Sequence, residues 1–104
     1  MKNTIVTLML LGFSLTAFAS DQQYIASLGV SSKGQFVALE EYGYKSELKS
    51  YYVNVKIMNV WTKEYVGKEV NLQALALRPS ELLKIREQAK LLAHGDLLKY
   101  KIIK

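Results

Sequence analysis

Side chains capable of acid–base chemistry are few and scattered in this chain. Glu40 and Glu41 are adjacent carboxylates in a segment typical of a strand, and His94 is the only histidine. Neighbours on a strand point to opposite faces, so these two carboxylates cannot share one proton or one scissile bond. We expect Glu41 to pair with a lysine across a hairpin and His94 to lie at a helix end. The pattern favours a non-enzymatic protein with no catalytic residues, although it leaves activity open.

Metal binding is equally unsupported by the residue types. The chain has no cysteine and one histidine, whereas a structural zinc site needs four converging nitrogen or sulfur ligands. A small exported domain without disulfides must be stabilised by packing, by self-association or by a part of the protein beyond this chain. We therefore expect neither a metal nor a cofactor.

Aromatic and basic side chains are better candidates for binding. The chain has seven tyrosines, one tryptophan and a net charge of +5, which would suit a glycan, an acidic partner or an anionic lipid surface. Cross-strand packing of the rings and ordinary lysine solvation explain the same residues, and packing is the favoured explanation. We expect Tyr44 and Tyr52 to face solvent. The candidate interaction surface consists of Tyr44, Tyr52, Lys56, Trp61 and Tyr65.

The first twenty residues have the pattern of a bacterial export signal. Lys2 precedes an apolar stretch over residues 5–18, and Ala17 and Ala19 occupy the positions that signal peptidase recognises. Cleavage after Ala19 would leave residues 20–104 as one small domain without a transmembrane segment. An uncleaved membrane anchor is the alternative, but the stretch is short for a span and no basic anchor follows it. We expect a periplasmic or secreted protein, and export together with scattered basic residues argues against nucleic acid as a partner.

Alternating apolar residues predict four strands, over residues 24–30, 35–42, 51–60 and 65–72. Polar turns over residues 31–34 and 61–64 connect the first pair and the last pair. Both faces of the second strand are apolar, so we expect it to be central and covered on both sides. This spacing indicates an antiparallel meander.

A helix is predicted over residues 80–94, with Ser80 as N-cap and Gly95 as C-cap. Its apolar stripe suits docking on one face of the sheet and consists of Leu82, Ile85, Ala89 and Leu92. Beyond Gly95, apolar residues alternate with lysines, which predicts the start of another strand in a domain cut short. The fold class is α+β: a blade-like, four-stranded antiparallel meander followed by one amphipathic helix, after a cleaved signal peptide.

Two stretches resemble a bacterial family of predicted secreted proteins of unknown function. Residues 28–43 are similar to its pattern G-F-S-x-D-G-x-x-x-A-F-E-E-Y-G, and residues 55–62 are similar to its I-Y-V-I-D-V-x-T strand. The same pattern is similar to a single blade of TolB-type β-propellers. Lys33 and Asn59 stand where the family has aspartate, and the loop over residues 44–51 lacks the family's D-G-S-G-F-P segment. The resemblance implies ancestry and no particular activity.

Taken together, these features favour an exported, non-enzymatic binding or interaction module whose partner is a protein or a glycan. Exposed sheet edges offer a second route to association, including self-association by strand addition. The alternative is a truncated fragment of a larger secreted enzyme or propeller-like protein, with no activity of its own.

Overall fold

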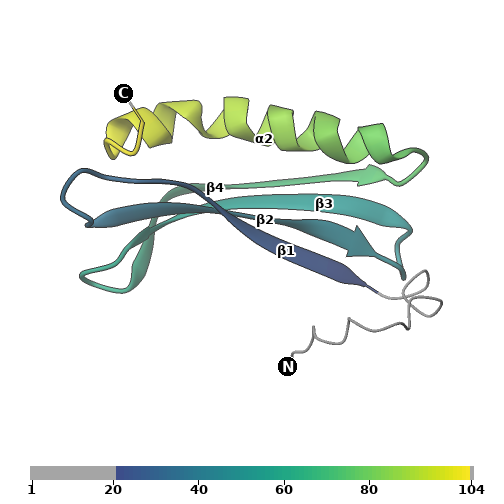
Figure 1. Ribbon diagram of the computed structural model, residues 1–104, viewed down its shortest axis with the longest axis horizontal. Helices are drawn as coiled ribbons and strands as arrows, with labels where there is room; N and C mark the ends of the chain where they lie inside the picture. Colours follow the sequence, from purple (N-terminus) through teal and green to yellow (C-terminus); the bar gives the residue numbers. More distant parts are fainter. Residues whose placement is uncertain (1–20, 104) are drawn as a thin grey trace.

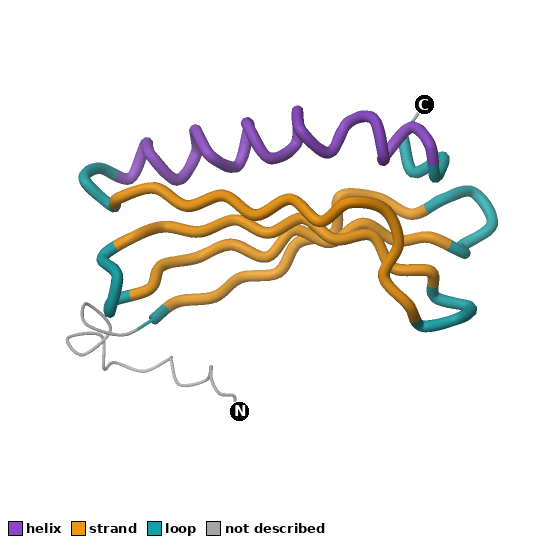
Figure 2. Tube along the Cα trace, turned by 180° about the vertical axis from the view of Figure 1, so that it is seen from behind, coloured by secondary structure: helices purple, strands orange, loops and turns teal. Residues whose placement is uncertain are grey.

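Four strands follow one another along the chain and pair in the same order, each antiparallel to its neighbour. They are β1 (Gln22–Val30), β2 (Phe36–Lys45), β3 (Ser50–Asn59) and β4 (Glu64–Leu75). The helix α2 (Pro79–Lys99) then lies along one face of the sheet (Figure 1 and Figure 2). This computed structural model describes residues 21–103, and the predicted signal peptide lies outside the described residues. The predicted α+β arrangement of a meander followed by a helix is confirmed.

The hairpin turns are held by short polar side chains. In the β1–β2 turn, Ser31 Oγ accepts a hydrogen bond from the Phe36 N–H at 3.0 Å. In the β3–β4 turn, Asn59 Oδ1 accepts a hydrogen bond from the Trp61 N–H at 3.0 Å. Such bonds replace ladder hydrogen bonds where the chain reverses, which is why serine and asparagine favour these positions.

Two strands extend beyond their predicted ends. β2 continues to Lys45 and β4 to Leu75, because Ser50 at the start of β3 pairs with both of these residues. The predictions ended these strands at residues 42 and 72, where the apolar alternation fades. Backbone pairing with a neighbouring strand, rather than side-chain type, keeps the ends extended.

β4 carries a bulge that the helix supports. The register shifts between Val66 and Val70, opposite Lys56. Within the bulge, the Lys68 N–H donates a hydrogen bond of 2.8 Å to Asp96 Oδ2 on α2. Gly67 has a φ of +73°, which a residue with a side chain rarely adopts. Asp96 thus satisfies a backbone group that the bulge removes from the ladder.

The core lies between α2 and the half of the sheet formed by β3 and β4. Aliphatic residues at alternate strand positions meet helix residues three or four apart. The buried members are Ala38, Val53, Val55, Ile57, Ile85, Ala89, Ala93, Leu97 and Ile102.

Two sequence-based expectations, about which helix residues are buried and which sheet faces are covered, differ from the structure. Leu92 does not belong to the buried stripe of the helix, because its side chain is 63% exposed, whereas Ala93 and Leu97 do. In the described part of the chain, β2 is central as predicted, but α2 covers only one side of the sheet. Val37 and Leu39 on the other side are half-buried. Four strands with one helix form two layers, so one sheet face stays open.

The helix ends later than predicted, and the predicted additional strand after Gly95 is wrong. α2 continues through Gly95 to Lys99, and its N-cap is Arg78 rather than Ser80. At its end, the Ile102 N–H donates to the Leu97 carbonyl at 2.9 Å. Lys101 adopts the left-handed conformation, with φ of +61°. This is a Schellman motif, in which Ile102 is buried against the core.

Substituting Gly95→Ala is expected to stabilise the fold by up to about 1 kcal/mol, because alanine is the better residue inside a helix. A side chain at this position would meet no neighbouring atom within 4 Å. Urea unfolding followed by circular dichroism measures the change. A loss of stability would instead fit a helix that ends at Gly95.

Candidate functional site

The face of the sheet opposite α2 is the candidate functional site, and we call it the open face. One row of directly paired residues crosses all four strands on this face and is entirely apolar. This apolar row consists of Val30, Val37, Met58 and Tyr65. Its outer members are well exposed, Val30 at 53% and Tyr65 at 59%.

A bulge in β1 completes the apolar row. The register shifts between Ser27 and Gly29, so that Val30 pairs with Val37. Strict alternation along β1 would place Val30 with Tyr24 on the helix side. The bulge shifts that alternation by one residue and turns the Val30 side chain to the open face.

The structure places three of the five predicted surface residues on the open face. Tyr52 and Lys56 alternate with the buried residues of β3, so they face away from the helix. Tyr65 of β4 pairs with Met58, which faces the same way. Trp61 lies in the adjoining β3–β4 turn with 64% of its surface exposed. Tyr44 lies on the helix side of the sheet, half-buried, with its ring centroid 6.0 Å from that of Tyr51. Cross-strand packing therefore accounts for Tyr44.

Lys56 occupies the centre of the open face between two carboxylates. Its Nζ is 3.3 Å from Glu41 Oε1 and 4.0 Å from Glu69 Oε2, and it lies 5.4 Å from the centroid of the Tyr65 ring. Burial acts to lower the pKa of Lys56, but its hydrogen bond and charge interactions, chiefly with Glu41, outweigh burial and raise that pKa. The expected pairing of Glu41 with a lysine on the neighbouring strand is confirmed, and the centre of the face carries compensated charge.

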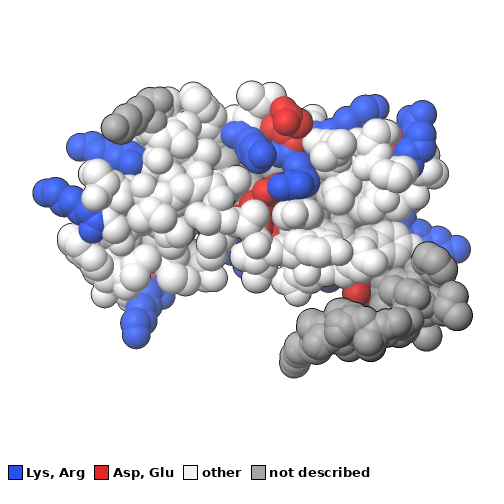
Figure 3. Space-filling view, in the orientation of Figure 1, with Lys and Arg blue, Asp and Glu red and all other residues white. Residues whose placement is uncertain are grey.

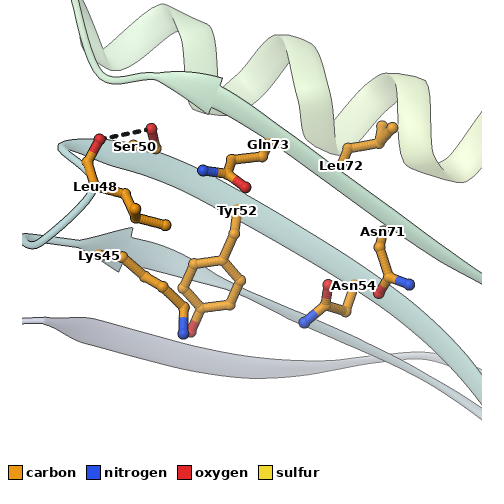
Figure 4. A pocket seen from close by; sticks show the side chains of 8 residues that line it. All are labelled: Lys45, Leu48, Ser50, Tyr52, Asn54, Asn71, Leu72 and Gln73. Atoms are coloured by element: carbon orange, nitrogen blue, oxygen red, sulfur yellow. Dashed lines mark hydrogen bonds between the residues drawn. The ribbon is translucent and has the colours of Figure 1, made fainter.

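A shallow hollow of about 280 Å³ lies beside these charges, over the ends of β3 and β4 (Figure 4). Six of its eight lining residues have polar side chains. Two pairs of them are direct cross-strand partners, Asn54 with Asn71 and Tyr52 with Gln73. We call this site the amide hollow. Its lining consists of Lys45, Leu48, Ser50, Tyr52, Asn54, Asn71, Leu72 and Gln73.

An ion pair beneath the helix is the feature that the sequence pattern did not reveal. Glu40 is fully buried, and its two carboxylate oxygens accept hydrogen bonds from Arg86 Nε at 2.8 Å and Arg86 Nη2 at 3.0 Å. The guanidinium also stacks over the Tyr42 ring, 3.8 Å from its centroid. The pKa of Arg86 is raised, mainly by its hydrogen bond to Glu40. The only signal in the sequence was the place of Glu40 between Ala38 and Tyr42 on an apolar strand face.

The groups capable of acid–base chemistry lie on separate surfaces. Glu40 is enclosed under α2, Glu41 pairs with Lys56 on the open face, and His94 lines a groove of about 350 Å³ between α2 and β1. In this view of the molecule, acidic and basic side chains gather near the middle, and further Lys or Arg side chains project at both ends (Figure 3). Within residues 21–103, no three metal-ligating side chains converge.

Comparisons with family models, curated proteins and solved structures gave no match to this chain. The resemblance to a bacterial secreted family and to a propeller blade therefore stays a prediction. The consecutive strand order is that of a blade, but α2 covers one sheet face here. Across the described residues, no helix has the length and apolar character needed to cross a bilayer.

Proposed function

We propose that this protein is an exported, non-enzymatic binding module that holds its partner against the open face of its sheet. The apolar row is the observation that carries this proposal. It spans the full width of the sheet, and no other described part of the chain covers it. Contiguous exposed apolar surface of this kind marks interaction sites on proteins.

The composition of the open face also supports binding. Tyr65 and Trp61 are large, exposed aromatic residues at one end of the apolar row, and aromatic side chains dominate the energetics of many interfaces. Lys56 and its carboxylates add fixed charges that can orient a partner.

The sheet edges are less suitable for association than the open face. Both edge strands, β1 and β4, carry a register shift. Bulges at sheet edges disfavour pairing with a second chain, because they interrupt the row of free backbone groups. The proposed export to the periplasm or the medium rests on the pattern of residues 1–20, and it makes nucleic acid an unsuitable partner.

Site-specific photo-cross-linking in the source organism tests the proposed surface. A photoreactive phenylalanine analogue in place of Tyr65 is expected to form covalent adducts with the partner. The matched position is Tyr24, which is also about half exposed, at 51% against 59%, but which stacks on Tyr42 on the helix side. Adducts from Tyr24 alone, or equally from both positions, would contradict binding through the open face. Cells in which neither position forms an adduct would contradict the proposed function itself.

A further inference from the structure

We propose that the amide hollow is a binding site for saccharide units, so that the partner of the open face is a glycan. This inference rests on the proposed function and names its ligand class. The amide hollow combines neutral amides, a phenol and exposed carbon surface in one concave site at one end of the open face. Ligand sites are typically concave, with a few converging polar groups that fix orientation.

The hydrogen-bonding groups of the amide hollow are available to a ligand. With its amide nitrogen donating, Asn71 lies 2.7 Å from Asn54 Oδ1 and 3.0 Å from Glu69 Oε2. The same nitrogen lies 3.3 Å from the Val70 carbonyl oxygen. In the described part of the chain, the Asn54 amide nitrogen donates no hydrogen bond to another side chain. Among residues 21–103, the Gln73 amide and the Tyr52 hydroxyl make no hydrogen bond with another side chain. The hollow therefore offers both donors and acceptors, which is what a sugar hydroxyl needs.

Tyr52 contributes a phenol that keeps its proton. Burial raises the pKa of Tyr52 above 10.0, and the charges of Glu41 and Asp21 raise it further. The hydroxyl is consequently a hydrogen-bond donor at neutral pH. The Tyr52 ring and the half-exposed Leu48 side chain supply carbon surface for the C–H face of a pyranose.

The charges around the hollow favour a neutral ligand over an anionic one. Among the described residues that line the hollow, Lys45 is the only cation, and its Nζ lies 5.3 Å from the centroid of the Tyr52 ring. Glu69 borders the hollow because it accepts a hydrogen bond from Asn71. Glu41 borders it because its charge raises the pKa of Tyr52. Lys56 pairs with both carboxylates, so these charges largely cancel and give an anion little net attraction. An extended peptide would be expected at a sheet edge, where backbone groups are free, rather than on a face.

Nuclear magnetic resonance titration of the purified, isotope-labelled protein tests the site. The probes are chitotetraose and cellotetraose, with a heparin tetrasaccharide and an alanine-rich polar peptide as competing classes. A shallow site of this size is expected to bind a neutral tetrasaccharide with a dissociation constant on the order of 1 mM. Shifted backbone signals should be confined to the residues around Tyr52, Asn71 and Gln73. No shift with either neutral saccharide, or shifts only with heparin or peptide, would overturn the proposal.

Matched variants on the two sides of the sheet test the assignment to the amide hollow. Tyr52→Leu and Asn71→Ala are each expected to weaken saccharide binding about tenfold or more, whereas Tyr24→Leu, at an exposed tyrosine on the helix side, should leave it unchanged. Thermal melts confirm that each variant is folded. Equal loss in the Tyr24→Leu variant would overturn the assignment to the hollow. Cross-linking from Tyr65 is scored independently, so it can succeed with a protein partner while the saccharide titration fails.

Discussion

Replacing Arg86 with methionine is expected to destabilise the fold by about 3–5 kcal/mol, since it leaves a buried carboxylate without its counter-charge. Glu40 has no exposed surface, and both of its oxygens accept hydrogen bonds from Arg86. Methionine keeps the length of the side chain and its packing on Tyr42 but removes every donor. A domain of this size has a total stability of about 5 kcal/mol or somewhat more. Urea unfolding should therefore show a large loss or a chain that is no longer folded.

Two further variants keep this prediction testable even if the single variant does not fold. The double variant Glu40→Met with Arg86→Met is expected to recover most of the lost stability, because apolar residues can replace a buried ion pair. Lys56→Met removes the cation from the partly exposed pair with Glu41 and should cost about 1 kcal/mol or less, well below the loss for Arg86→Met. A double variant as unstable as Arg86→Met alone would show that the loss does not come from the uncompensated carboxylate.

Substituting Leu97→Ala is expected to cost about 2–5 kcal/mol, the range found when a buried leucine is truncated. Leu97 lies in the last turn of α2, is 5% exposed, and its carbonyl accepts the hydrogen bonds that end the helix. Its side chain fills the end of the core beside Ile102. Chemical unfolding measures the loss, and hydrogen exchange should show that the last helical turn opens more readily.

The control for this prediction is another leucine of the same helix. Leu91 is 75% exposed, so Leu91→Ala is expected to change the stability by less than about 0.5 kcal/mol. Similar losses of stability for the two variants would contradict the burial of Leu97 between the helix and the sheet. They would favour the earlier end of the helix that the sequence predicted at residue 94.

The strands and the start of the helix were predictable because local patterns encode them. Alternating apolar residues in residues 51–60 identify β3 and its buried face, since side chains on a strand point to opposite faces in turn. Pro79 ends the extended region for a local steric reason. Glu40 and Glu41 were correctly assigned to opposite faces by the same alternation.

The end of the helix was not predictable by the same means. Gly95 is a frequent helix terminator, but here the helix continues because Leu97 and Ile102 are buried on the core. The burial of two large apolar side chains outweighs the cost of one glycine within a helix, about 1 kcal/mol. That burial depends on the sheet beneath the helix, which a local pattern does not contain.

The same distinction between local pattern and packing applies to the candidate site. Residue types and spacing were enough to identify candidates for binding, because tyrosine, tryptophan and lysine on alternating strands are recognisable, and enough to predict the meander that holds them. Which of these residues share a surface depends on the packing of the helix and the strands. The position of α2 over one face left Tyr52, Lys56 and Tyr65 on the open face and placed Tyr44 on the other. The β1 bulge added Val30 to the apolar row, and strand pairing brought Asn54 beside Asn71. These contacts join residues far apart in the sequence, so they follow from packing between elements rather than from the pattern within any one of them.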